Sequence, residues 1–96
     1  MDLLIFVSSK LAGPIFIPLA KACERNNLIW SVFFTGEGIH NLRDSVTLKV
    51  INSAESTVVC EESWTAVFES KTCPVKLGSQ TDNSFLVSKA RKVISL

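Results

Sequence analysis

Cys60 occupies a position in the sequence where a thiol can do chemistry. The segment "TVVCEESW" (57–64) passes from an apolar run through Cys60 to Glu61 and Glu62. If the strand ends at Val59 and a helix begins near Glu61, the sulfur lies at a helix N-terminus, where the partial positive charge stabilises a thiolate. The two carboxylates oppose a second negative charge. Because free cysteine is also common as a small buried apolar residue, both interpretations of Cys60 stay open at this stage.

The other two cysteines give weaker indications of chemistry. Cys23 falls on the apolar face of an expected helix and is interpreted as core, whereas Cys73 precedes Pro74 and is interpreted as a loop thiol. A helix of about ten residues would hold Cys60 and Cys73 roughly 15 Å apart, too far for an intrachain disulfide. The spacings contain no C-x-x-C pair, so neither a thioredoxin motif nor a structural metal site is expected.

The segment "TGEGIH" (35–40) is the second candidate for a functional role. Gly36 and Gly38 suit a tight turn at a strand end, and Glu37 would then project outward. His40 is the single histidine and could titrate near neutral pH, although such a residue usually lies on the surface. The segment lacks the lysine and the spacing of a phosphate-binding loop, and no serine has a histidine and an acid placed for a hydrolase triad.

Short apolar runs alternate with amphipathic segments along the chain, a pattern typical of an α/β fold with a mostly parallel sheet of four or five strands. The segment 41–54 is ambiguous, because alternating β-branched residues favour a strand whereas its position between two parallel strands favours a short helix, which we prefer. A last short helix would begin at an N-cap of Thr81 or Asp82. The expected strands are 3–8, 28–34, 56–60, a short 74–77 and 91–96, and the other expected helices are 13–25 and 61–70.

The carboxyl ends of parallel strands meet at one edge of a sheet, and ligands bind there in open α/β sheets. Three segments are expected at this edge: Ser8–Leu11, Thr35–His40 and Cys60–Trp64. Glu37 and His40 would shape the pocket, and Trp64, one helical turn after Cys60, would cover it. Around Cys60, the candidate pocket residues are Ser8, Ser9, Gly36, Glu37, Gly38, His40, Glu61 and Trp64.

Composition limits the classes of function. The 96 residues predict a single domain over 1–96, and the net charge of +1 without a basic block argues against nucleic-acid binding. No apolar run approaches the roughly 20 residues of a membrane span, and the acidic start is unlike a signal peptide, so we expect a cytoplasmic protein. The mean hydropathy of +0.31 is high for a small domain and indicates oligomerisation. No cofactor is indicated.

The order of these segments resembles the DsrE-like family, which includes the DsrE, DsrF and TusD sulfur-relay proteins. The resemblance rests on "SVFFTGEGIHNL" at the end of the second expected strand and on Cys60 after the third. It implies a small three-layer α/β sandwich with flavodoxin-like strand order, assembled as a homotrimer or homohexamer. It also implies that Cys60 accepts sulfur as a persulfide from a donor protein and passes it to an acceptor. The family has small apolar residues in place of "EESW", and its basic Gly-containing turn is absent here.

Two other functions remain open. The chain could be a non-catalytic oligomeric subunit that binds a protein partner or a small ligand in the crevice at the strand ends, with Cys60 merely buried. The parallel sheet and the "TGEG" turn also suggest a nucleotide- or flavin-binding module, but fold alone does not establish such a function.

Overall fold

The computed structural model describes residues 1–96 and contains one five-stranded sheet in which every neighbouring pair of strands is parallel. The α/β class with a parallel sheet is therefore confirmed. The strands are β1 (Leu3–Val7), β2 (Trp30–Phe34), β3 (Ser56–Cys60), β4 (Lys76–Gly78) and β5 (Lys92–Ser95).

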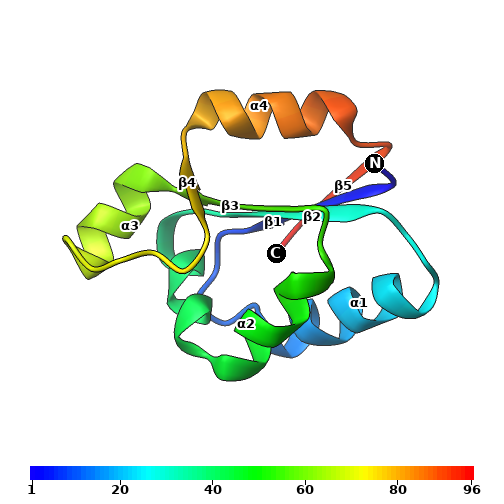
Figure 1. The fold of residues 1–96 in the computed structure, drawn as a ribbon, viewed down its shortest axis with the longest axis horizontal. Coiled ribbons are helices and arrows are strands. Elements are labelled where there is room, and N and C mark those ends of the chain that lie inside the picture. Colours follow the sequence, from blue (N-terminus) through cyan, green and yellow to red (C-terminus); the bar gives the residue numbers. More distant parts are fainter.

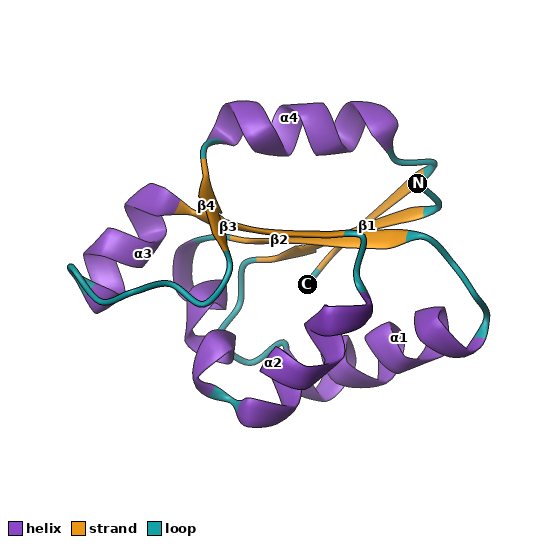
Figure 2. Ribbon diagram, in the orientation of Figure 1, coloured by secondary structure: helices purple, strands orange, loops and turns teal.

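Helices cover both faces of the sheet and make three layers (Figure 1, Figure 2). On one face lie α1 and α2 with the 3₁₀ helices η1 and η2, whereas α4 lies alone on the other. The short α3 continues from β3 beyond the edge of the sheet. The bounds are α1 (Gly13–Arg25), η1 (Gly36–Arg43), α2 (Ser45–Val50), η2 (Ile51–Ser53), α3 (Glu61–Phe68) and α4 (Gln80–Lys89). None of these helices is long and apolar enough to cross a membrane.

The strand order is β4-β3-β2-β1-β5, so the expected flavodoxin-like order of 2-1-3-4-5 is wrong. From β1 the chain moves in one direction through β2, β3 and β4, and α4 then crosses back to place β5 on the free side of β1. Right-handed crossovers that run in opposite directions place their helices on opposite faces. This explains why α4 lies apart from α1 and α2.

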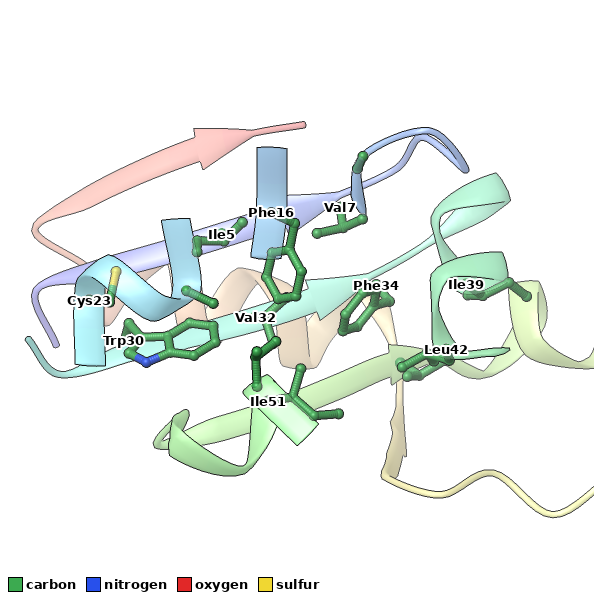
Figure 3. Close-up of a cluster of buried hydrophobic side chains, with 14 of the residues drawn as sticks. Ile5, Val7, Phe16, Cys23, Trp30, Val32, Phe34, Ile39, Leu42 and Ile51 are labelled. Atoms are coloured by element: carbon green, nitrogen blue, oxygen red, sulfur yellow. The ribbon is translucent and has the colours of Figure 1, made fainter. Parts of the chain in front are cut away.

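The two faces of the sheet build two separate cores. The larger core lies on the α1 and α2 face, where Phe16 of α1 packs edge-to-face against Trp30 and Phe34 of β2. Figure 3 shows these rings among side chains from β1, β2 and η1. The smaller core lies under α4 and consists of Leu4, Phe33, Val58, Cys60 and Leu86.

Most of the expected elements are confirmed, with local shifts. The short helix within 41–54 is present as α2, and α1 runs through Pro18 without interruption. The strand expected at 74–77 is instead Lys76–Gly78. Neither Thr81 nor Asp82 is the N-cap of α4, because Ser79 takes that position and forms a capping box in which Asp82 accepts from the Ser79 amide.

Candidate functional site

The last residue of β3 is Cys60, which is also the N-cap of α3. Side chains alternate between the two faces along a strand, so the Cys60 side chain points to the α4 face together with Val58, whereas Val59 points to the larger core. The residue is buried, with 5% of its surface exposed. The thiol therefore sits at the junction of β3, α3 and the covering helix α4.

Polar groups from two neighbouring segments surround the Cys60 sulfur. The hydroxyls of Ser63 and Thr35 and the backbone amides of Glu62 and Ser63 each lower the pKa of the thiol. The Ser63 hydroxyl accepts from the Gly36 amide at 2.8 Å. Thr35 and Ser63 also lie 3.4 Å apart, oxygen to oxygen. The end of β2 and the first turn of α3 are thus joined around the thiol.

These donors favour the charged form of Cys60. Burial raises the pKa of the thiol, but the hydrogen bonds from Ser63, Thr35 and Glu62 outweigh burial and lower the pKa below its ordinary value. At Cys23 and Cys73 burial raises the pKa, and at Cys73 a hydrogen bond with the Val75 backbone offsets only part of this. All three cysteines are free. Cys60 is the one among them whose pKa is lowered, so its thiol loses a proton more readily than the other two.

Cys60 also lines a pocket of about 760 Å³ between the first turns of α3 and α4. The pocket lies at the carboxyl ends of β3 and β4, at the outer edge of the sheet. Most of its lining residues have polar or charged side chains, although the surface they expose to the pocket is mainly apolar, and two small residues, Ala66 and Gly78, complete it. The lining residues are Cys60, Glu61, Glu62, Thr65, Ala66, Gly78, Ser79, Gln80 and Thr81.

The α4 side of the pocket is shaped by Gly78 and Gln80. A Cβ atom added at Gly78 would lie 2.6 Å from Cγ1 of Val58 and 2.8 Å from Oδ2 of Asp82, so a side chain there would displace the wall. The amide nitrogen Nε2 of Gln80 lies 4.0 Å from the Cys60 sulfur. The first residues of α4 therefore stand directly beside the thiol.

Of the expected pocket residues, only Glu61 lines the pocket beside Cys60. Gly36 contributes indirectly, because its amide holds the Ser63 hydroxyl. Trp64 belongs to the larger core, where it packs on Phe68 and donates its indole N–H to the carbonyl of Lys71 at 2.7 Å. The side chain expected to cover the thiol thus faces the opposite side of α3.

The remaining expected residues gather around η1 rather than in the pocket. His40 pairs with Glu37 at 3.1 Å and contacts the Phe68 ring of the larger core. The Ser8 hydroxyl donates to the carbonyl of Leu96, and the Ser9 carbonyl accepts from the Asn41 side chain at 2.9 Å.

Gly38 has a structural reason to be glycine. A Cβ atom there would lie 2.1 Å from the Val7 carbonyl oxygen, closer than any packed side chain allows. The end of β1 and η1 therefore meet backbone to backbone, away from the thiol.

The expectations from sequence omitted three residues next to the thiol: Thr35, Ser63 and Gln80. Ser63 could have been found, because it follows Cys60 by three residues, the spacing of an N-cap and its partner at the third helical position. Thr35 lies within the expected segment after β2. Nothing in the sequence indicates Gln80, which approaches through the crossover of β4 and α4.

The arrangement combines a nucleophile with room for a reactant. It holds no group of three His, Cys, Asp or Glu side chains that could bind a metal ion. The thiolate form of a cysteine that lines a pocket can attack a sulfur or a carbon electrophile. No protein-family model, curated protein or solved structure matches this chain, so the geometry of the site and the short motifs of the sequence carry the functional argument.

Proposed function

We propose that this protein is a sulfur carrier that accepts sulfur on Cys60 as a persulfide and passes it to another thiol. The observation that carries the proposal is a cysteine at the junction of β3 and α3 that lines a pocket, with polar groups of Thr35, Glu62 and Ser63 that lower the pKa of its thiol. The resemblance to the DsrE-like family, noted for "SVFFTGEGIHNL" and the position of Cys60, points to the same chemistry.

The transfer is a thiol exchange in which atoms and electrons balance. The Cys60 thiolate attacks the outer sulfur of a donor persulfide, R–S–SH. A bond forms between Cys60 Sγ and that sulfur, the S–S bond of the donor breaks, and its electron pair leaves with R–S⁻. The outer sulfur keeps its proton, so the products are Cys60–S–SH and R–S⁻, and no external oxidant or reductant is needed.

The residues around Cys60 have distinct parts in this step. The amides of Glu62 and Ser63 and the hydroxyls of Ser63 and Thr35 stabilise the attacking thiolate. Once the outer sulfur is bound, it extends into the pocket beside Gln80. Attack on this sulfur by an acceptor thiol returns Cys60 to the thiolate.

We further propose that the carrier acts in the cytoplasm as a homo-oligomer, a trimer or a hexamer. A thiol that must stay reduced suits a reducing compartment. Large apolar side chains on the α4 and β5 side of the sheet remain exposed in the single chain, among them Phe85, Val87 and Val93, and burial between copies would remove them from water. A donor or acceptor protein would approach the open pocket.

The experiment that tests the proposal is sulfur loading with assignment to each cysteine. The folded protein is treated with inorganic polysulfide and analysed by mass spectrometry of its peptides. We expect Cys60 to gain one sulfur atom ahead of Cys23 and Cys73, and to lose it to an added acceptor thiol. The variants Cys60→Ser and Cys73→Ser form the matched pair: only the first should abolish loading. Equal loading of Cys60→Ser would overturn the proposal and favour a non-catalytic subunit.

A further inference from the structure

The pocket beside Cys60 is far larger than the sulfur atom that the proposed reaction transfers. Its volume of about 760 Å³ falls within the roughly 300–1,000 Å³ that is typical of small-molecule sites. The group that carries the sulfur therefore fits into the pocket together with the sulfur. The charges and hydrogen-bond donors of the lining then determine which carrier groups bind.

The charged groups that line the pocket are both acidic. Glu61 and Glu62 contribute carboxylates from the first turn of α3, and no lysine or arginine belongs to the lining. The nearest basic residue along β4, Lys76, lines a different pocket and lies 3.9 Å from the carboxylate of Asp82. The residues that line the pocket thus carry a net negative charge.

Several amide donors at the helix N-termini are already engaged, which limits how far these termini offset the negative charge for a ligand. At the start of α3 the amides of Glu62 and Ser63 lower the pKa of the Cys60 thiol. At the start of α4, the amides of Thr81 and Asp82 donate to the Ser79 hydroxyl, and the Ser79 amide donates to Asp82. An anionic carrier group would meet two carboxylates while these amide donors are already used.

We propose that the Cys60 pocket selects sulfur donors whose carrier group is a small cation, that is, aminothiol persulfides with an ammonium group a few bonds from the sulfur. The inference rests on the proposed function, since it names the donor class of the same site. The ammonium would lie near Glu61 and Glu62 while the outer sulfur reaches Cys60, and the polar side chains of Gln80 and Thr81 would face the remaining donor atoms.

Charge selectivity can be measured with simple disulfides that differ in the charge of their carrier groups, provided that the different reactivities of their leaving thiols are corrected for. The probes are cystamine, which carries two ammonium groups, 3,3′-dithiodipropionate, which carries two carboxylates, and the neutral bis(2-hydroxyethyl) disulfide. In each case Cys60–S⁻ and R–S–S–R give Cys60–S–S–R and R–S⁻. Each rate is first divided by the rate of the same probe with free 2-mercaptoethanol, which cancels the different reactivities of the leaving thiols. The result is then divided by the value for the neutral probe, which cancels changes in the reactivity of Cys60 itself.

At low ionic strength we expect cystamine to react with Cys60 about fivefold faster than the neutral probe, and dithiodipropionate to react more slowly by a similar factor. High salt should remove most of both differences, because it screens charges near the surface. The double variant Glu61→Gln/Glu62→Gln should abolish the preference, and each single variant should reduce it. Glu24→Gln removes one charge, as each single variant does, from α1 on the opposite face of the sheet from α4. It is the matched control for the single variants and should retain the preference.

Equal normalised rates for the three probes in the wild-type protein, or an equal preference in the double variant, would overturn the inference. Circular dichroism checks that each variant is folded. Sulfur loading with polysulfide at high ionic strength separates the two proposals. Loading of Cys60 without any charge preference among the disulfides refutes the donor class alone, whereas a charge preference without any loading refutes the sulfur carrier.

Discussion

At the scale of single residues, the properties of Cys60 depend on uncharged hydrogen-bond donors. The carboxylates nearest to it, those of Glu61 and Glu62, belong to exposed residues, so water screens their effect on the sulfur. The hydroxyls and amides are fixed and close. The sequence suggests two opposing effects on the pKa of Cys60, a lowering by the helix amides and a raising by the glutamates. In the structure the lowering prevails.

The substitution Ser63→Ala tests this balance. It removes the hydroxyl that donates to the Cys60 sulfur, so we expect the pKa of Cys60 to rise. Alkylation requires the thiolate, and its rate increases with pH until the thiolate is fully formed, so the midpoint of the pH–rate profile should move to higher pH. Ser63→Thr keeps a hydroxyl and should restore the lower midpoint, and Ser70→Ala is a control outside the site. An unchanged midpoint in Ser63→Ala would contradict this role of the hydroxyl.

Residue identities predicted part of the site. Cys60 and Glu61 were found because they follow a recognisable strand, and their neighbours along α3 follow from helical spacing. Trp64 was misplaced, because its position relative to Cys60 fits both a lid and a core residue. Trp64 is a core residue, because it is buried against Phe68. No local sequence pattern reveals this contact. Gln80 reaches the thiol only through the tertiary fold.

At the scale of secondary-structure elements, one close approach joins β1 to η1. Gly38 lies against the carbonyl of Val7, where an added Cβ would be 2.1 Å from the oxygen. We expect Gly38→Ala to lower the free energy of unfolding by about 2 kcal/mol or more, because backbone must shift to admit the methyl group. Chemical denaturation measures the loss.

The matched control for this prediction is Gly13→Ala at the start of α1. The nearest atom to an added Cβ there is 3.5 Å away, an ordinary contact, and alanine favours helix over glycine. This variant should be as stable as the wild-type protein or slightly more stable. Equal stabilities of Gly38→Ala and Gly13→Ala would contradict the close approach.

The capping box at the start of α4 fixes the wall of the pocket beside Gln80. Ser79 accepts from the amides of Thr81 and Asp82, so Ser79→Ala should cost about 1 kcal/mol of stability. Thermal denaturation measures this cost, and Ser84→Ala, at an exposed position in the middle of the same helix, is the control. An equal loss of stability in Ser84→Ala would indicate that the missing cap does not cause the loss in Ser79→Ala.

Most of the elements are predictable from the sequence, and the short helix α2 is among them. Residues 41–54 alternate as a strand would, and only the need for a crossover between parallel strands identifies α2. The expected strand 74–77 begins two residues before β4 and ends one residue before it, because Pro74 and Val75 form an apolar stretch with Leu77. β4 ends at Gly78, which lies close to Val58 of the neighbouring strand β3, a contact that local sequence does not reveal.

At the scale of the whole molecule, the single helix α4 covers one face of the sheet. That face retains exposed apolar residues, including Val93 of β5, which is 44% exposed. We therefore expect the protein to sediment as an oligomer at micromolar concentration. Analytical ultracentrifugation measures the mass, and the mass of one chain at every concentration would contradict the expected assembly.

The α/β class followed from the sequence because buried parallel strands read as continuous apolar runs. The order of those strands did not follow, because crossovers of similar length can join neighbouring or distant strands. The position of β5 beside β1 is decided by the apolar pairs that form there, such as Ile94 beside Ile5. Long-range pairings of this kind leave no local signal.

The central claim is that Cys60 is an accessible thiolate in the folded protein, and its alkylation tests that claim most directly. The native protein is treated with limiting iodoacetamide over a range of pH, and mass spectrometry measures modification at Cys60, Cys23 and Cys73. We predict that Cys60 reacts first, with a midpoint below the pKa of about 8.5 of a free thiol. If Cys60 reacts only after denaturation, it is a core residue, and the account of the site is contradicted.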